Sequence, residues 1–262
     1  MSRKTDLEPL MDGEGASAKP LKVNAGFQYE LDLIRALREK GFNVSDPAGA
    51  DSAKADLELT PTYKAQVIKF ELKEKLSADF AQMNFDFDTG SMQFTIDKTK
   101  ASAQKEAAKT MIGIAESYNI IREANAHWNP KRNIPAKFTL SNDATLTQRK
   151  SAHSLDLKRF PDKFLAEGQA AAREVEKYYN SKNTYYIQVK GKGLYYMGRD
   201  VEGYGCPQFS TSVANSSIRI RIKTNSKSNA RWSFLMALKI SGLRKSSMDL
   251  DGDTNFLLKP GL

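Results

Sequence analysis

Apolar and polar residues alternate in two neighbouring segments of the chain, residues 56–59 and 67–75. The linker between them is built around Pro61, which favours a turn. In the second segment the apolar positions are Ile68, Phe70 and Leu72, and the polar positions are Lys69, Glu71, Lys73 and Lys75. Because successive side chains of a strand point to opposite faces, one face can pack on a core while the other carries the charges. The pattern predicts a β-hairpin with one charged face.

A helix is predicted over residues 24–40, where apolar residues recur at three- and four-residue spacing. Its apolar positions are Phe27, Leu31, Ile34 and Leu37. Asn24 is suited to cap the start of this helix, and Gly41 to end it. A short strand is expected over residues 42–44. Residues 1–22 show no periodic apolar pattern, which predicts a disordered or loosely docked lead.

The middle of the chain is predicted to be mainly helical. Residues 91–96 alternate and predict a third strand, and an alanine-rich pattern predicts a long helix over residues 98–126. The buried positions expected for this helix are Ala107, Met111, Ile114, Ala115, Tyr118 and Ile121. Residues 127–153 break the periodicity, so a long loop or small insertion is expected there. A second helix is predicted over residues 155–180.

From residue 184 onward the pattern changes to strands. Residues 184–190 and 194–198 flank a Gly-Lys-Gly turn, which predicts a hairpin, and further strands are expected over residues 217–223 and 232–240. The sequence therefore predicts an α/β protein with a mixed sheet flanked by helices and an additional C-terminal β-rich part. We expect a core at 23–126 and a basic helix-plus-β-rich part at 127–262, which either stands apart or packs with the core as one domain.

Charge is distributed unevenly along the chain. Residues 1–100 contain 14 Lys and Arg against 17 Asp and Glu, whereas residues 101–262 contain 26 against 14, and the whole chain has a net charge of +9. Such a surplus suits a polyanionic partner, because neutralising phosphates drives nucleic-acid binding. Many proteins with no such partner are equally basic, so the surplus alone does not decide the matter.

A row of cations is predicted on the strand over residues 217–223. Arg219, Arg221 and Lys223 share one face of this strand, and Lys227 follows in the next turn. Spaced about 6–7 Å apart, these side chains suit a phosphate backbone, and they are the candidate nucleic-acid-binding residues. Nearby tyrosines are candidates for stacking on bases, namely Tyr185, Tyr186, Tyr195 and Tyr196. Alternatively, the cations keep an exposed face of the sheet soluble and the tyrosines lie at the edge of the core.

Several classes of protein find no support in the sequence. No apolar run approaches the roughly 18–20 residues that span a bilayer, and a lone cysteine, Cys206, allows neither an internal disulfide nor a cysteine-rich zinc site. His127 and His153 lack partners at metal-ligand spacing, and no Gly-rich nucleotide loop is present. We expect a cytoplasmic protein with no membrane partner.

The charged face of the predicted hairpin carries the chemistry that is most specific. If Asp56 lies beside Glu71, two carboxylates can share a divalent metal, with Lys73 next to them. Carboxylate oxygens suit Mg²⁺, which binds through one or two carboxylates together with waters and substrate phosphate. Such a metal makes a bound water nucleophilic, and the lysine can orient that water or the phosphate.

Asp56, then Glu71 and Lys73 spaced as Glu-x-Lys on an apolar strand, resemble the PD-(D/E)xK nuclease superfamily, whose fold is that of restriction endonucleases. The resemblance covers about residues 24–100, and Ala55 replaces the proline of the motif. It implies a metal-dependent DNA endonuclease in which Asp56, Glu71 and the backbone carbonyl of Leu72 hold Mg²⁺ or Mn²⁺. It also implies help from Glu30 on the first helix, and an origin in a phage or mobile element.

Other functions remain open at this stage. The same charged strand fits a non-catalytic nucleic-acid-binding or structural protein whose Asp, Glu and Lys form ordinary salt bridges. With the same fold, the substrate can instead be RNA, or the cleavage exonucleolytic. Since cutting both strands of a duplex usually requires two active sites, a homodimer is the expectation for a duplex cutter.

Overall fold

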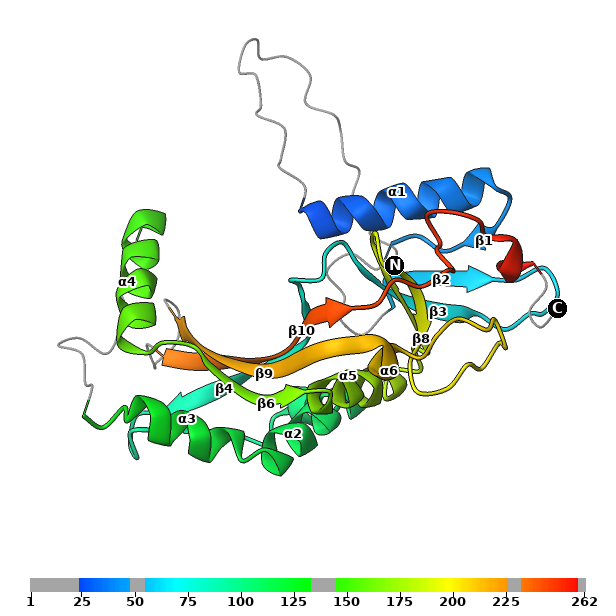
Figure 1. The fold of residues 1–262 in the computed structure, drawn as a ribbon. Helices are drawn as coiled ribbons and strands as arrows, with labels where there is room; N and C mark the ends of the chain where they lie inside the picture. The colour runs from blue at the N-terminus through cyan, green and yellow to red at the C-terminus, as the bar shows by residue number, and fades with distance from the viewer. Residues whose placement is uncertain (1–23, 48–54, 133–144, 226–231, 259–262) are drawn as a thin grey trace, which may run out of the picture.

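The computed structural model describes residues 24–47, 55–132, 145–225 and 232–258. Within them the protein has an α/β fold built on two five-stranded sheets (Figure 1). The predicted lead at residues 1–22 and the candidate Lys227 lie outside the described residues.

The first sheet, here called sheet 1, is mixed. Its strands are β1 (Asn43–Val44), β2 (Leu57–Thr60), β3 (Ile68–Lys73), β7 (Tyr186–Val189) and β8 (Gly193–Tyr196), in the order β1-β2-β3-β7-β8. β3 and β7 run parallel, and the other neighbours are antiparallel. The predicted hairpins and the α/β class are confirmed. The expectation that residues 24–126 supply this whole sheet is wrong, because β7 and β8 come from the C-terminal half. The domain boundary at residue 126 stays a prediction.

The second sheet, sheet 2, is antiparallel throughout. Its strands are β4 (Asp79–Asp88), β5 (Gln93–Thr95), β6 (Lys163–Gly168), β9 (Val213–Thr224) and β10 (Trp232–Leu243), in the order β5-β4-β10-β9-β6. The predicted strand at 91–96 corresponds to β5, but it pairs with β4 rather than joining the hairpin. Sequence patterning left β4 unassigned. This strand follows β3 after a short connection, so the two sheets are joined directly beside Lys73.

The helices are α1 (Ala25–Glu39), α2 (Glu106–Ser117), α3 (Ile120–Trp128), α4 (Leu146–Arg159), α5 (Ala170–Asn180) and α6 (Phe209–Ser212), with short 3₁₀ turns η1 (Ala101–Gln104) and η2 (Asn255–Leu257). α1 is confirmed with its predicted ends: the side chain of Asn24 accepts a hydrogen bond from Gly26 N, and Gly41 has a φ of 87°. No helix in the described part of the chain is long and apolar enough to cross a membrane.

Three predictions for the middle of the chain are wrong. The single helix over 98–126 is two helices, because Asn119 adopts a left-handed conformation with a φ of 52° and ends the first. The loop predicted over 127–153 includes the start of α4, where Thr145 and Gln148 cap the helix reciprocally. The helix predicted over 155–180 is divided into the end of α4, strand β6 and α5, and the chain leaves the helix at Phe160, just before Pro161.

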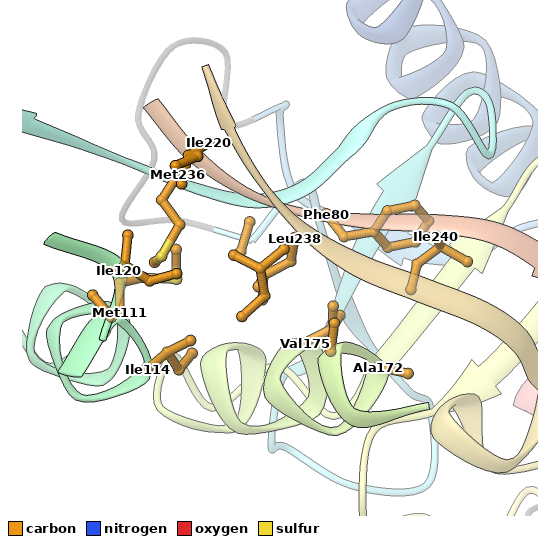
Figure 2. Packing of buried hydrophobic residues seen from close by; sticks show 14 of the residues in the cluster. Phe80, Met111, Ile114, Ile120, Ala172, Val175, Ile220, Met236, Leu238 and Ile240 are labelled. Atoms are coloured by element: carbon orange, nitrogen blue, oxygen red, sulfur yellow. The ribbon is translucent and has the colours of Figure 1, made fainter. Parts of the chain in front are cut away.

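Two hydrophobic cores result from this arrangement. α1 packs on one face of sheet 1, and α2, α3 and α5 pack on one face of sheet 2. Figure 2 shows the second core, in which side chains of β9 and β10 point toward those of the helices, among them Ile220, Met236, Leu238, Met111, Ile114 and Val175. The opposite face of sheet 2 is not covered by any described helix, and α4 stands at the end of this sheet far from α1 (Figure 1).

The segment after β10 returns to sheet 1 and closes its edge. Leu194 N donates to the carbonyl oxygen of Met248 over 2.7 Å, and Ser246 N donates to that of Lys192 over 2.8 Å. This close approach depends on Gly193, whose φ is 100°. A Cβ at that position would collide with the backbone oxygen of Met248 and the side chain of Ser246.

We expect Gly193→Ala to lower the free energy of unfolding by more than about 2 kcal/mol, because it adds this collision to the strain of a positive φ. Gly191→Ala is the matched control: Gly191 also has a positive φ, of 71°, but its Cβ would meet nothing within 4 Å. Its cost should be only about 1 kcal/mol. Urea unfolding of both variants measures the difference, and equal costs would show that the closing segment does not press on Gly193.

Candidate active site

The hairpin brings Asp56 and Glu71 together. β2 and β3 pair antiparallel with Leu57 opposite Phe70, so the next position places Asp56 beside Glu71. Asp56 lies just before β2, and its Oδ2 accepts a hydrogen bond from Leu72 N over 2.9 Å. The predicted juxtaposition of the two carboxylates is therefore present, and the adjacent strand fixes the position of Asp56.

Glu71 is the buried centre of this cluster, with only 5% of the residue exposed. Its Oε1 accepts from Lys73 Nζ at 2.5 Å and from the hydroxyl of Tyr179 at 2.8 Å. Its Oε2 is also buried but has no hydrogen-bond partner among the described residues. One oxygen of the carboxylate is thus fully engaged, and the other is left open to a further ligand.

α5 and the turn after it supply two groups that sequence patterning missed. The hydroxyl of Tyr179 lies within hydrogen-bonding reach of both Glu71 Oε1 and the carbonyl oxygen of Phe80. Lys182 places its ammonium over the rings of Tyr178 and Tyr179, at 5.7 and 5.6 Å from their centroids. No local pattern in residues 155–182 distinguishes these residues, because their role depends on contacts with a strand about 100 positions earlier in the chain.

Glu30 reaches the same cluster from α1. The buried residues of this helix are Tyr29, Leu33, Ile34 and Leu37, so two of the four predicted positions, Phe27 and Leu31, are only half-buried. Glu30 therefore borders the buried stripe through its neighbour Tyr29. Its Oε2 is buried without a hydrogen-bond partner among the described residues. The charges of Glu71 and Lys73 act on Glu30, so it lies within electrostatic reach of the cluster that Asp56, Glu71 and Lys73 form.

Burial raises the pKa of two carboxyl groups in this site, and the charge of Glu71 adds to both shifts. Burial raises the pKa of Asp56 to about 7, the charge of Glu71 adds to the shift, and Lys73 and the Leu72 amide oppose it. Burial likewise raises the pKa of Glu30 to about 6, with Glu71 adding to the shift and Lys73 opposing it. Strongly perturbed acids of this kind cluster at functional sites.

Glu71 and Lys73 stabilise each other's charged forms. Burial alone would raise the pKa of Glu71, but the charges of Lys73 and Lys182 and the hydrogen bonds from Lys73 and Tyr179 lower it overall. Burial would lower the pKa of Lys73, but the charges of Glu71 and Asp56 raise it overall. The site therefore holds an ionised glutamate and a protonated lysine side by side.

The donor set fits a hard divalent cation. In the described part of the chain no three His, Cys, Asp or Glu side chains form a metal-binding group. Mg²⁺ does not require one, since it binds through one or two carboxylates and otherwise through water and phosphate. The unpaired Oε2 atom of Glu71 and the raised pKa of Asp56 are the features that a cation would relieve. The ligand role of the Leu72 carbonyl stays a prediction.

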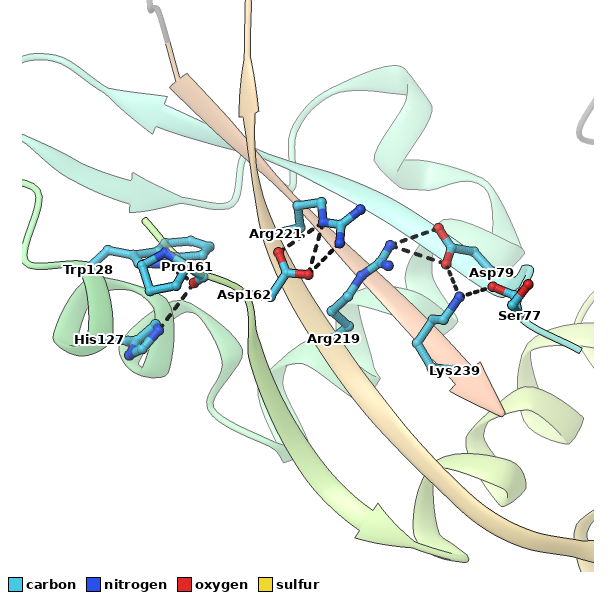
Figure 3. A network of polar contacts seen from close by, with 9 residues as sticks. All are labelled: Ser77, Asp79, His127, Trp128, Pro161, Asp162, Arg219, Arg221 and Lys239. Atoms are coloured by element: carbon cyan, nitrogen blue, oxygen red, sulfur yellow. Dashed lines mark hydrogen bonds and ion pairs between the residues drawn. The ribbon is translucent and has the colours of Figure 1, made fainter. Parts of the chain in front are cut away.

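The predicted cation row occupies one face of β9, but two of its members are already paired. Arg219 bonds to Asp79, which also binds Lys239 Nζ at 2.8 Å, and Arg221 forms two-pronged contacts with Asp162 (Figure 3). Lys223 is exposed and lies 3.3 Å from the side-chain oxygen of Asn84. Nucleic-acid binding by these three residues stays a prediction, and Lys227 lies outside the described residues.

The predicted stacking role is wrong for two of the four tyrosines. Tyr186 and Tyr195 are fully buried, and their hydroxyls bond to Asp200 and to backbone oxygens. They lie on opposite faces of sheet 1 and each is packed in a hydrophobic core, so no base can reach their rings. Tyr185 and Tyr196 are half-buried, and the ring of Tyr185 is held against the guanidinium of Arg199 at 5.5 Å.

No protein-family model matches the chain, and a search of curated proteins finds no match. Among solved structures, HhaI endonuclease in complex with DNA is similar, with a TM-score of 0.46 and 10% sequence identity. The similarity covers 89% of this chain and 95% of that chain. The chemistry of the site therefore rests on its own geometry.

The pH dependence of the free energy of unfolding tests the raised pKa of Asp56. Its pKa of about 7 in the folded, metal-free protein exceeds the ordinary value of 3.8, so folding favours the protonated acid. The stability contributed by this group is present below about pH 4 and lost as the pH rises toward 7. We expect Asp56→Asn to raise the free energy of unfolding by up to about 4 kcal/mol at pH 8 and by clearly less at pH 5. Urea unfolding in EDTA at both pH values measures this, and an equal gain at the two would contradict it.

The ion pairs on the open face of sheet 2 predict a difference between two aspartates of β4. Asp79→Ala leaves Arg219, whose side chain is 11% exposed, and Lys239 without their carboxylate. We expect a loss of about 2–4 kcal/mol in the free energy of unfolding. Asp86→Ala on the same strand breaks only an exposed pair with Lys100 and should cost less than about 1 kcal/mol. Chemical denaturation compares the two, and a loss at Asp79 no larger than at Asp86 would refute the structural role of the network.

Proposed function

We propose that this protein is a metal-dependent nuclease that hydrolyses DNA phosphodiester bonds at the cluster of Asp56, Glu71 and Lys73. The observation that carries the proposal is the buried Glu71 carboxylate, with one oxygen held by Lys73 and Tyr179 and the other unpaired beside Asp56. A salt bridge on a solvated strand face needs neither burial nor an open oxygen. The resemblance to PD-(D/E)xK nucleases names the same residues.

Asp56 and Glu71 would hold Mg²⁺ or Mn²⁺, with the Leu72 carbonyl as a further ligand. The bound cation would supply positive charge to the phosphate and a nucleophilic water. Lys73 keeps its proton and places a fixed positive charge beside the carboxylates, which favours the negative charge that develops on a phosphodiester held there. The Tyr179 hydroxyl orients Glu71 so that Oε2 remains available.

Glu30 has a separate part in this proposal. With a pKa of about 6 it changes protonation close to neutral pH, so its Oε2 can accept a proton from water near the site. It comes from α1 and not from the hairpin. α1 packs, through Tyr29 and Leu33, on the face of sheet 1 that is opposite to the Glu71 side chain. The role of Glu30 is therefore to assist proton transfer, while Asp56 and Glu71 bind the metal.

Two features favour a nucleic acid as the substrate. The chain is basic, and α4 exposes Arg149, Lys150 and Lys158 while its sole acid, Asp156, is buried. The open face of sheet 2 and α4 thus offer a broad surface that a duplex can contact. Endonucleolytic cleavage of both strands would require two copies of the site, which is why we also propose a homodimer.

Cleavage of supercoiled plasmid tests the proposal. We expect nicking or linearisation in Mg²⁺ and none in EDTA, and a loss of at least about 100-fold in Lys73→Ala, since charge stabilisation in the transition state disappears. Lys69→Ala is the matched control, because Lys69 lies on the same face of β3 but pairs with Glu58 at 3.7 Å. Its activity should equal that of the wild type.

Two results would overturn the proposal. Activity that survives Lys73→Ala would place the chemistry elsewhere or assign it to a contaminant. DNA binding without cleavage of plasmid, branched or single-stranded substrates in any divalent metal would instead favour a non-catalytic nucleic-acid-binding protein.

A further inference from the structure

A groove lies beside the candidate active site, between the edge of β4, the start of α2 and the end of α5. Its volume is about 380 Å³. Its lining includes Gln82, Met83, Lys105, Met111, Tyr178 and Lys182. The groove adjoins the site through Tyr178, whose ring lies 5.0 Å from that of Tyr179, and the Tyr179 hydroxyl donates to Glu71.

Lys182 is the residue of this groove that is best suited to bind an anion. Its side chain is half-buried, and its ammonium is held over the rings of Tyr178 and Tyr179. It has no carboxylate partner at salt-bridge distance among the described residues. Its charge nevertheless acts on Glu71, whose pKa it helps to lower. A cation that is positioned by aromatic rings and not neutralised is suited to receive an anion.

The other charged residues that line the groove also favour the binding of an anion. Lys105 lies on the rim opposite Lys182 and is exposed. The acid that borders the groove, Glu106, is exposed and paired with Lys109 at 2.8 Å. Lys105 and Lys182 therefore line the groove as cations, while the charge of Glu106 is neutralised by Lys109, which does not line it. The apolar wall of Met83 and Met111 leaves room for a sugar or base between the charged rims.

The position of the groove also distinguishes it from the predicted cation row. Arg219 and Arg221 lie on the face of sheet 2 opposite α5 and are paired with Asp79 and Asp162. Lys182 follows α5 and lies next to the Glu71 cluster. Its ammonium lies over the ring of Tyr179, whose hydroxyl donates to Glu71.

We infer that this groove binds the phosphodiester backbone of the nucleic-acid strand next to the cleaved bond. Lys182 contacts a phosphate, Lys105 contacts a second phosphate at the far rim, and Tyr178 supports the intervening nucleotide with its ring. The inference rests on the proposed function, because it takes Glu71 and Lys73 as the site of cleavage. It adds a binding subsite, formed by residues that the hairpin motif does not contain.

Binding in EDTA tests the groove without requiring cleavage. Fluorescence anisotropy of a labelled 20-base-pair duplex is measured for the wild type and for Lys182→Met, which keeps the aliphatic packing on the tyrosines but removes the charge. We expect affinity to fall roughly 5- to 10-fold and the slope of log K against log salt to decrease by about 1. Lys177→Met, on α5 just before Lys182, is the control, because Lys177 is exposed and paired with Glu174. It should bind like the wild type.

The outcomes separate the two proposals. Wild-type protein that binds duplex while Lys182→Met binds with the same affinity and salt slope overturns the groove and leaves the nuclease proposal standing. Wild-type protein that binds no duplex in EDTA also overturns the groove, because its cations act without a metal, and the plasmid assay alone then decides the nuclease proposal. If thermal unfolding shows that Lys182→Met is misfolded, Lys105→Gln at the exposed rim replaces it, with the same expected loss of about 1 in the salt slope. An unchanged slope in that variant also overturns the groove.

Discussion

An ionised carboxylate in the interior of a sheet has to be compensated, and the compensation of Glu71 determines much of the architecture around it. Lys73 neutralises it from the same strand, and the Tyr179 hydroxyl reaches it from α5 while also contacting the start of β4. Leaving such a charge uncompensated costs several kcal/mol. Sheet 1, sheet 2 and α5 therefore have to meet at one place, and they meet at the candidate active site.

The compensation is incomplete. Among the described residues, one oxygen each of Glu71 and Glu30 is buried without a hydrogen-bond partner, and burial raises the pKa of Asp56. A protein selected for stability alone would replace one of these acids by an amide or an apolar residue. Local conflict of this kind, kept within a well-packed fold, is the usual mark of a site that gains its missing partner from a ligand.

The parts of the fold that local pattern determines could be predicted from the sequence. The hairpin of β2 and β3, the capped helix α1 and the hairpin around Gly191 follow from alternation, capping and turn residues. The parallel partner of β3 could not be predicted, because β7 lies more than 100 residues away and parallel pairing leaves no local trace. The same holds for Tyr179 and Lys182. Both occupy ordinary positions around the end of a helix, and only the docking of α5 against the hairpin gives them a role.

The separation of these partners along the chain determines when, during synthesis, they can first come into contact. Glu71 and Tyr179 are 108 residues apart, and the Tyr29 hydroxyl on α1 bonds to Asp251, 222 residues later. At a translation rate of roughly 5–20 residues per second, the ribosome needs about 5–20 seconds to make the first interval alone. A nascent chain therefore carries its motif residues long before the groups that organise them. The buried Glu71 carboxylate can therefore gain its partner from α5 only after residue 179 has been synthesised.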